Sequence, residues 1–342
     1  MNALQKEENI MKKWLRICFS TLLIISMLTF IAACSKDDAK TVRIAEVTRS
    51  IFYAPQYVAI EKGFFEEEGL NVELTTTWGG DKTMTALLSN GADVALVGSE
   101  TSIYVEAQGS DDPVLNFAQL TQTDGTFLVS REKIDNFSWD LLKGSDFLGQ
   151  RKGGMPQMVG EFVLKKHNID PQQDLNLIQN VDFANIANAF LGGTGDFVQL
   201  FEPQASVVEQ EGKGYIVASF GTESGNVPYT TFMSKSSYIE AEKETIQKFT
   251  NAIQKAQTWV ADNSAKDIAE VILPYFEDTD VATIEMVIDR YKSQGSFATD
   301  PILDEAEWNN LKNIMDEAGE LPEDITHEKL VNTDFATKST EE

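Results

Sequence analysis

The residues of this sequence whose types and positions suggest a chemical role are suited to bind a ligand rather than to react with it. Two glycine pairs, Gly79-Gly80 and Gly153-Gly154, precede predicted helices, where free backbone N–H groups favour an anionic group. Aromatic side chains close to predicted strand ends suit the walls of a pocket for an apolar or planar solute. These aromatic residues are Phe52, Tyr53, Trp78 and Phe201.

The predicted ligand-binding residues lie in loops that follow strands or precede helices, or in a hinge. The set is Ser50, Phe52, Tyr53, Trp78, Gly79, Ser99, Glu100, Gln122, Gly153, Gly154, Met155, Asp182 and Glu202. Core packing is the alternative for the aromatic residues, and a plain turn is the alternative for Gly79-Gly80. Glu100 and Glu202 could each accept hydrogen bonds from N–H groups of a ligand. For Glu202 the alternative is that its side chain orients the backbone.

Catalytic and metal-binding patterns are missing from the sequence. Its two histidines, His167 and His327, fall near a helix end and near the C-terminus, away from the predicted pocket loops. We find no Ser/His/Asp arrangement, P-loop or metal-ligand motif. The two cysteines, Cys18 and Cys34, are too few for a Cys-ligated zinc or iron–sulfur site. We therefore expect no enzyme activity, no metal and no cofactor.

An alternation of strands and helices positions the predicted pocket loops. The apolar patterns predict strands over 41–47, 72–77 and 93–98 with helices between them, which indicates a mainly parallel sheet. A second α/β unit follows, with strands predicted over 126–130, 175–179, 196–201 and 215–218 and helices over 157–167 and 185–191. From residue 237 the chain is almost entirely helical, with helices over 237–262, 264–273, 280–293 and 304–318. The polar residues 333–342 are predicted to be a flexible tail.

Composition supports two domains and argues against several partner classes. The 342 residues include 54 acidic and 28 basic side chains, for a net charge of −26. So acidic a chain is a poor partner for nucleic acid, because phosphate binding needs clustered lysine and arginine. Hydrophobic residues make up 42%, which is ordinary for a globular protein with cores of its own.

The N-terminal region is predicted to be an export signal. Basic residues at Lys12, Lys13 and Arg16 precede an uncharged stretch that ends in Ile31-Ala32-Ala33-Cys34. This pattern predicts a lipoprotein signal peptide over 1–33, diacylation of the Cys34 thiol, and a polar tether over 34–40. A transmembrane helix is the alternative, since nineteen uncharged residues are just long enough to span a bilayer. Met11 fits a translation start better than Met1.

Four segments in order resemble one family over about residues 41–320. Ala54 to Leu74 includes Lys62-Gly63-Phe64-Phe65-Glu66-Glu67-Glu68-Gly69-Leu70, and it resembles the opening of solute-binding proteins of the nitrate, sulfonate and taurine and thiamine-pyrimidine-precursor type. Asn90–Gly98, Asn168–Leu175 and Gly195–Pro203 are similar to the segments that follow in that family. The resemblance implies a type II periplasmic-binding-protein-like α/β fold with two lobes and two hinge crossovers. Lobe one would contain 41–122 plus 232–332, and lobe two would contain 123–231, with hinges near Leu120–Gly125 and Pro228–Phe232.

The family implies an extracytoplasmic receptor that closes two lobes on a solute and delivers it to an ABC permease and its ATPase. The predicted lipid on Cys34 would anchor the receptor at the extracellular face of the membrane. The chain would act as a monomer. We expect a small organic or inorganic anion of the sulfonate or nitrate kind. A thiamine-precursor-like pyrimidine or another aromatic solute is the alternative, although Arg49 to Pro55 departs from the stretch usual in the pyrimidine branch. A sensory receptor without a transport role is a further alternative.

Overall fold

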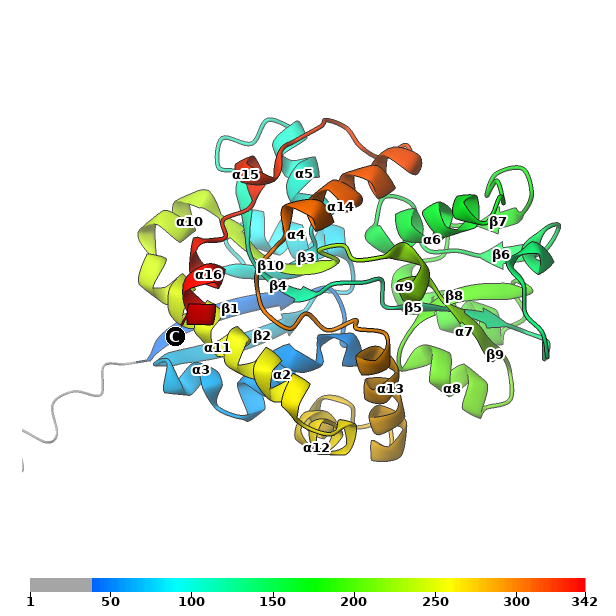
Figure 1. The fold of residues 1–342 in the computed structure, drawn as a ribbon, viewed down its shortest axis with the longest axis horizontal. Helices are drawn as coiled ribbons and strands as arrows, with labels where there is room; N and C mark the ends of the chain where they lie inside the picture. Colours follow the sequence, from blue (N-terminus) through cyan, green and yellow to red (C-terminus); the bar gives the residue numbers. More distant parts are fainter. Residues whose placement is uncertain (1–38, 342) are drawn as a thin grey trace, which may run out of the picture. The chain divides into compact units, whose positions relative to one another are not determined.

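The computed structural model describes residues 39–341. The predicted signal peptide, Cys34 and all but the end of the tether lie outside the described residues. The strands form two five-stranded sheets (Figure 1). We call the first sheet and the helices packed on it lobe A, and the second sheet with its helices lobe B.

Sheet A contains strands from both ends of the described chain. Its strands, in spatial order, are β2 (Leu70–Thr76), β1 (Lys40–Glu46), β3 (Val94–Gly98), β10 (Thr230–Lys235) and β4 (Val114–Thr121). β1 runs parallel to β2 and β3, and β10 runs antiparallel to β3 and β4. The near-continuous apolar run of β3 is buried, as expected for a strand covered on both faces.

Sheet B is built from the middle of the chain. In spatial order its strands are β7 (Asn176–Ile178), β6 (Asp146–Leu148), β8 (Phe197–Phe201), β5 (Thr126–Ser130) and β9 (Tyr215–Ser219). β6 is parallel to β7 and β8, and β5 is antiparallel to β8 and β9. Each sheet therefore has two parallel and two antiparallel pairings. The strands from which a mainly parallel sheet was predicted, β1, β2 and β3, do pair in parallel, but β10 and β4 make sheet A mixed. The strands that follow each crossover, β5 and β10, provide the antiparallel pairings.

Helices surround both sheets. Those of lobe A are α2 (Ala54–Glu61), α3 (Phe64–Glu67), α4 (Gly80–Leu88), α5 (Glu100–Ala107), α10 (Ser236–Ala241), α11 (Lys243–Asp262), α12 (Ala265–Ile272), α13 (Val281–Ser293), α14 (Glu305–Glu317), α15 (His327–Leu330) and α16 (Asp334–Glu341). Those of lobe B are α6 (Met155–Lys166), α7 (Ile186–Leu191), α8 (Gln204–Gln210) and α9 (Phe220–Ser224). Short 3-10 turns are η1 (Ile51–Tyr53), η2 (Trp139–Leu142), η3 (Phe183–Asn185) and η4 (Leu273–Tyr275).

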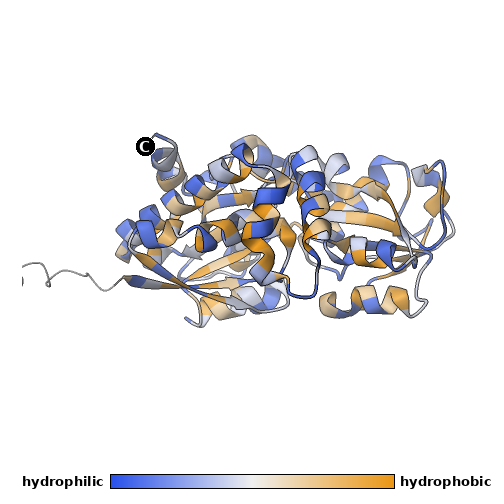
Figure 2. Ribbon diagram, turned by 90° about the horizontal axis from the view of Figure 1, so that it is seen from below, coloured by the Kyte–Doolittle hydropathy of each residue, from blue (hydrophilic) through white to orange (hydrophobic). Residues whose placement is uncertain are grey.

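Local sequence signals explain several of the C-terminal helix starts. The side chains of Ser264, Asp280 and Asp304 each accept a backbone N–H from the first turn of α12, α13 and α14. α11 is amphipathic, and its apolar face packs on α2, α3 and β4. Figure 2 shows the same division, with hydrophobic strands along the sheets and helices that carry a polar outer side.

The end of the chain differs from its prediction as a flexible tail. Residues 334–341 form α16, which packs against α11 and β4. Phe335 and Ala336 are buried there, and the Gln247 side chain donates to the Phe335 carbonyl over 3.0 Å. Two apolar residues are enough to dock this short helix, although the segment is polar overall. Among residues 39–341, no helix is long and apolar enough to cross a bilayer.

Candidate functional site

A cavity of about 460 Å³ is lined by residues of both lobes. Lobe A contributes the ends of β1 and β3 and the first turns of α4 and α5. Lobe B contributes the 150–156 loop before α6, together with Phe183 and Phe201. The cavity therefore lies at strand ends and helix N-termini, where open α/β sheets bind their ligands.

The carboxyl group of Glu100 is the most buried charged group that lines the cavity. Glu100 begins α5 and is 4% exposed. Its Oε1 accepts the backbone N–H of Met155 over 3.3 Å, and Met155 begins α6 in the opposite lobe. Its Oε2 has no hydrogen-bond partner among the described residues. Burial raises the pKa of Glu100 to about 8.

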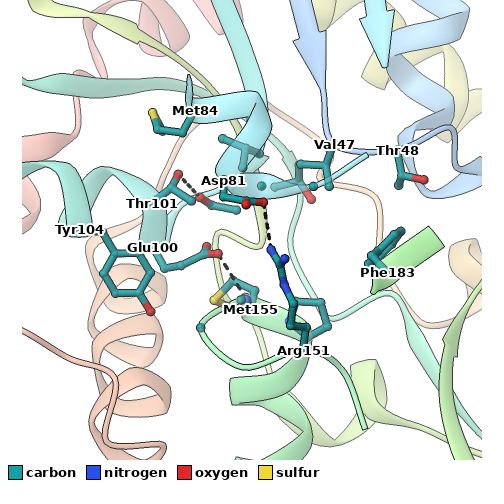
Figure 3. A pocket seen from close by; sticks show the side chains of 18 of the residues that line it. Val47, Thr48, Asp81, Met84, Glu100, Thr101, Tyr104, Arg151, Met155 and Phe183 are labelled. Atoms are coloured by element: carbon teal, nitrogen blue, oxygen red, sulfur yellow. Dashed lines mark hydrogen bonds and ion pairs between the residues drawn. The ribbon is translucent and has the colours of Figure 1, made fainter. Parts of the chain in front are cut away.

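The two basic residues among the described lining residues already have acidic partners. Arg151 pairs with Asp81 over 2.9 Å, an interaction that connects the lobes across the cavity (Figure 3). Lys152 pairs with Glu320 over 3.3 Å. The side chains of Arg151 and Lys152 are 48% and 68% exposed. The positive charges therefore lie toward solvent, and the unsatisfied acid lies at the buried end.

Aromatic and aliphatic side chains make up much of the remaining wall. Tyr53, Phe183, Phe201 and Tyr229 line one side, and the Phe183 and Phe201 rings are 5.7 Å apart. Burial raises the pKa of both tyrosines, so their hydroxyl groups stay protonated and polar at the wall. Aliphatic and aromatic residues of α4 and α5 also contribute: Met84, Leu88, Tyr104 and Val105. Figure 3 shows Met84 and Tyr104 on the side of the cavity opposite Phe183.

The structure brings six of the predicted ligand-binding residues to this cavity. They are Tyr53, Gly79, Glu100, Gly153, Gly154 and Met155. The glycine pair at 153–154 includes a residue in the left-handed region, Gly153 at φ 91°. Glycine adopts this conformation without strain, which shapes the loop that leads into α6.

Seven predicted residues lie outside the lining. Ser50 caps η1 and donates to the Glu202 carbonyl, and Phe52 is buried in an aromatic cluster with Tyr229 and Tyr291. Glu202 is fully buried, accepts from Ser206 and pairs with Arg290 of α13.

The other four predicted residues also lie outside the lining. The Ser99 hydroxyl donates to the Pro228 carbonyl, and the Gln122 amide donates to the Gly295 carbonyl. Trp78 is 46% exposed at φ 60°, and the exposed Asp182 lies 3.8 Å from Arg151. Position in a loop after a strand was too coarse a signal to separate these residues from the lining ones.

Sequence reasoning also missed lining residues. Met84 and Tyr104 lie one turn inside α4 and α5, where apolar periodicity indicates only core. Tyr229 directly precedes β10 and Thr230 begins it, and the sequence analysis did not predict this strand. Phe183 also lines the cavity and follows Asp182 directly, but it is not in the predicted set.

Neither histidine lines the cavity. His167 stacks on Trp139 with ring centroids 4.7 Å apart, and its ring nitrogen lies 3.1 Å from Glu223. His327 bonds the Leu303 carbonyl. Among residues 39–341, no group of three or more His, Cys, Asp or Glu side chains is arranged to hold a metal ion.

Comparison with solved structures shows a shared fold. The alkanesulfonate-binding protein SsuA from Xanthomonas axonopodis pv. citri, bound to MOPS, is 16% identical, with a TM-score of 0.68 over 87% of this chain and 100% of that one. A zinc-bound ligand-binding component of an ABC-type import system from Staphylococcus aureus is 12% identical, with a TM-score of 0.72 over 88% and 99%. The desulfurization enzyme DSZB also has this fold, at 12% identity and a TM-score of 0.63 over 88% and 99%. The fold is thus the type II periplasmic binding protein fold, and it is found in binding proteins and in an enzyme.

Sequence comparison gives a much closer relative. A Bacillus subtilis protein described as "Putative binding protein YtlA" is 63% identical over 97% of this chain and 100% of its own length. The NMT1-like family matches residues 36–273, which include the strands of both sheets and the whole cavity lining. The chain therefore belongs to the NMT1-like family.

Proposed function

We propose that this protein is the solute-binding component of an ABC importer, and that it encloses its solute in the cavity between lobe A and lobe B. The observation that carries the proposal is a cavity of about 460 Å³ to which both lobes contribute. Volumes of this size are usual for small-molecule sites, which are mostly apolar with a few polar groups. The resemblance to solute-binding proteins and the close relative described as a binding protein support the same function.

Contacts across the cavity fit a receptor that closes on its ligand. Arg151 of lobe B pairs with Asp81 of lobe A, and Lys152 pairs with Glu320 after α14. The Tyr104 hydroxyl on α5 donates to the Met158 sulfur on α6 over 3.6 Å. Such exposed or weak contacts each contribute little, so the cavity can open at this contact and release the solute at small cost.

The cavity favours an organic solute with an apolar or planar part over a nitrate-like ion. Its aromatic and aliphatic walls match such a body, and its volume is far larger than a four-atom ion fills. Small sulfonates remain the alternative that the fold relatives suggest, because SsuA is an alkanesulfonate-binding protein. The proposal also includes a monomer anchored by lipid on Cys34 at the extracellular face of the membrane, with a permease and an ATPase as partners.

Solute uptake and binding test this function directly. The lipid-anchored protein, purified from its own membranes, should carry a small molecule that native mass spectrometry detects. Readdition of that molecule to emptied protein at 100 times its dissociation constant should add about 2.7 kcal/mol of stability. Cells that lack the protein should lose uptake of the same molecule. Chemical conversion of the molecule by the purified protein, or unchanged uptake in the deletion strain, would contradict the proposal.

A further inference from the structure

We infer that the solute presents an N–H group to the carboxyl group of Glu100, so that the protein selects neutral or positively charged organic nitrogen compounds with an apolar body and rejects anions. This inference rests on the proposed function and adds the chemical class of the solute. It follows from three features of the cavity: the incomplete bonding of Glu100, the position of its carboxyl group at a helix start, and the distribution of positive charge.

The first feature is the incomplete bonding of a buried acid. Glu100 is 4% exposed, and one of its two carboxyl oxygens has no partner among residues 39–341. A buried carboxyl group without full hydrogen bonding loses the solvation that it had in water. A solute N–H group would restore that bonding, and a positively charged one would also balance the charge.

The second feature is that Glu100 already occupies the place where an anion would bind. Its Oε1 accepts the N–H of Met155 at the start of α6, a helix of twelve residues. The positive end of a helix is the usual anion site in this type of fold, but here the carboxyl group of a side chain from the opposite lobe already accepts the N–H of Met155. A sulfonate or carboxylate would have to displace the Glu100 carboxyl group from this N–H, or lie beside it and oppose its ionisation, whereas a positively charged solute would favour that ionisation.

The third feature is the lack of available positive charge near Glu100. The described basic residues of the lining, Arg151 and Lys152, pair with Asp81 and Glu320 and are largely exposed. Apart from Asp81 and Glu100, the remaining lining residues are uncharged: tyrosines, phenylalanines, aliphatic side chains, methionines, threonines, two glutamines and glycines. The net charge of −26 also attracts cations and repels anions at a distance.

Gly98 provides the space that Glu100 needs. A Cβ atom at position 98 would lie 2.1 Å from Oε2 and 2.7 Å from Oε1 of Glu100. The carboxyl group therefore lies directly over the last residue of β3, which lines the cavity together with it. This glycine fixes where the acid can be, and a larger residue there would push the acid out of place.

A matched series of small probes tests the inference. Benzamidinium, benzamide, benzoate and benzenesulfonate share one planar body and differ in the charge and donors of the head group. We would measure their dissociation constants with the full mature protein at one pH and ionic strength, by ligand-observed NMR. Benzamidinium should bind at least tenfold more tightly than either anion, with benzamide in between.

Two glutamine variants separate recognition by Glu100 from attraction by overall charge. Glu100→Gln should abolish the preference for benzamidinium, with the fold checked by circular dichroism and thermal unfolding. Glu106→Gln is the matched control, because Glu106 is on the same helix and pairs with Lys329 outside the cavity lining. It removes the same charge and should keep the preference.

Several outcomes would overturn the inference. A wild-type preference for benzoate or benzenesulfonate would do so, and so would a preference for benzamidinium that survives Glu100→Gln. Equal responses to the four probes, including none at all, would also overturn it. These results do not test the proposed importer function. That proposal is contradicted only if the protein converts the co-purified solute or if uptake of the solute does not depend on the protein.

Discussion

Two buried glutamates, each of which contacts the opposite lobe, show how one residue type takes two roles. Glu202 follows β8 in lobe B, and its carboxyl group is bonded by Arg290 of α13 and by the backbone N–H and hydroxyl of Ser206. Glu100 begins α5 in lobe A; its Oε1 accepts the Met155 N–H, and its Oε2 has no partner among residues 39–341. Burial raises the pKa of both acids, but Arg290 opposes that rise for Glu202, and no cation in the described part of the chain does so for Glu100.

The difference indicates which acid is structural and which is available to a ligand. The protein itself satisfies Glu202 and thereby joins the two lobes next to the crossovers. At Glu100 the bonding is left incomplete, at the one carboxyl group buried in the cavity wall among the described residues. The comparison makes opposite predictions for the removal of charge at the two places.

Loss of the arginine at the structural acid should have the largest effect. Arg290→Ala leaves the Glu202 carboxylate buried without its cation, and we expect the free energy of unfolding to fall by about 3–5 kcal/mol. Urea unfolding at pH 7 measures this loss. The double variant Glu202→Gln with Arg290→Met should recover most of it, because no unpaired charge remains.

A surface pair provides the control for this first prediction. Lys266 and Glu270 are 4.0 Å apart on α12, and both side chains are mostly exposed. Lys266→Ala should change the free energy of unfolding by less than about 0.5 kcal/mol. If Arg290→Ala were as mild, Glu202 would not depend on its partner and the contrast with Glu100 would disappear.

Replacement of Glu100 should change the free energy of unfolding in the opposite direction and stabilise the protein at high pH. Because the pKa of Glu100 is about 8 in the folded protein and near 4.5 in the unfolded chain, the folded state keeps a proton that the unfolded state loses. Wild-type stability should therefore fall as the pH rises from about 4.5 to 8. Glu100→Gln removes this contribution, so the variant should exceed wild type by about 2–4 kcal/mol at pH 9.

Urea unfolding of wild type and variant across pH 4 to 9 tests this second prediction. The groups that face Glu100, which include Tyr53, Tyr104 and Tyr229, have pKa values raised further by its charge and stay protonated throughout. The difference between the two stability curves therefore isolates Glu100. If the difference in the free energy of unfolding did not change with pH, Glu100 would have an ordinary pKa and the contrast with Glu202 would be wrong.

Much of the fold follows from local sequence signals, and the predicted elements show why. β1, β2 and β3 have clear apolar patterns, and α12, α13 and α14 begin at capping side chains, so each was predicted within a few residues. β10 was not, because Thr230–Lys235 is a short segment with polar residues. Its burial depends on pairing with β3 and β4, strands that lie far away in the sequence.

The site was less accessible to sequence reasoning than the fold. A loop after a strand can point to the cavity, as Gly79 and Glu100 do, or to solvent, as Trp78 does. The contact between Glu100 and Met155 joins two lobes, and no local pattern encodes it. For the aromatic residues, as for Glu100 and Glu202, the role therefore depends on the position in the fold and not on the residue type.

Two aromatic residues extend the comparison with the smallest expected effects. Phe183 lines the cavity near Phe201, whereas Trp78 is outside the lining and 46% exposed. Phe183→Ala should weaken solute binding by about 1 kcal/mol, roughly fivefold, because a ring contact with the solute is lost. Trp78→Ala should leave affinity within about twofold of wild type, since no contact with the cavity is removed. Calorimetry with the co-purified solute measures both, and a larger loss in Trp78→Ala than in Phe183→Ala would mean that the solute binds across the outer rim of lobe A instead of between the lobes.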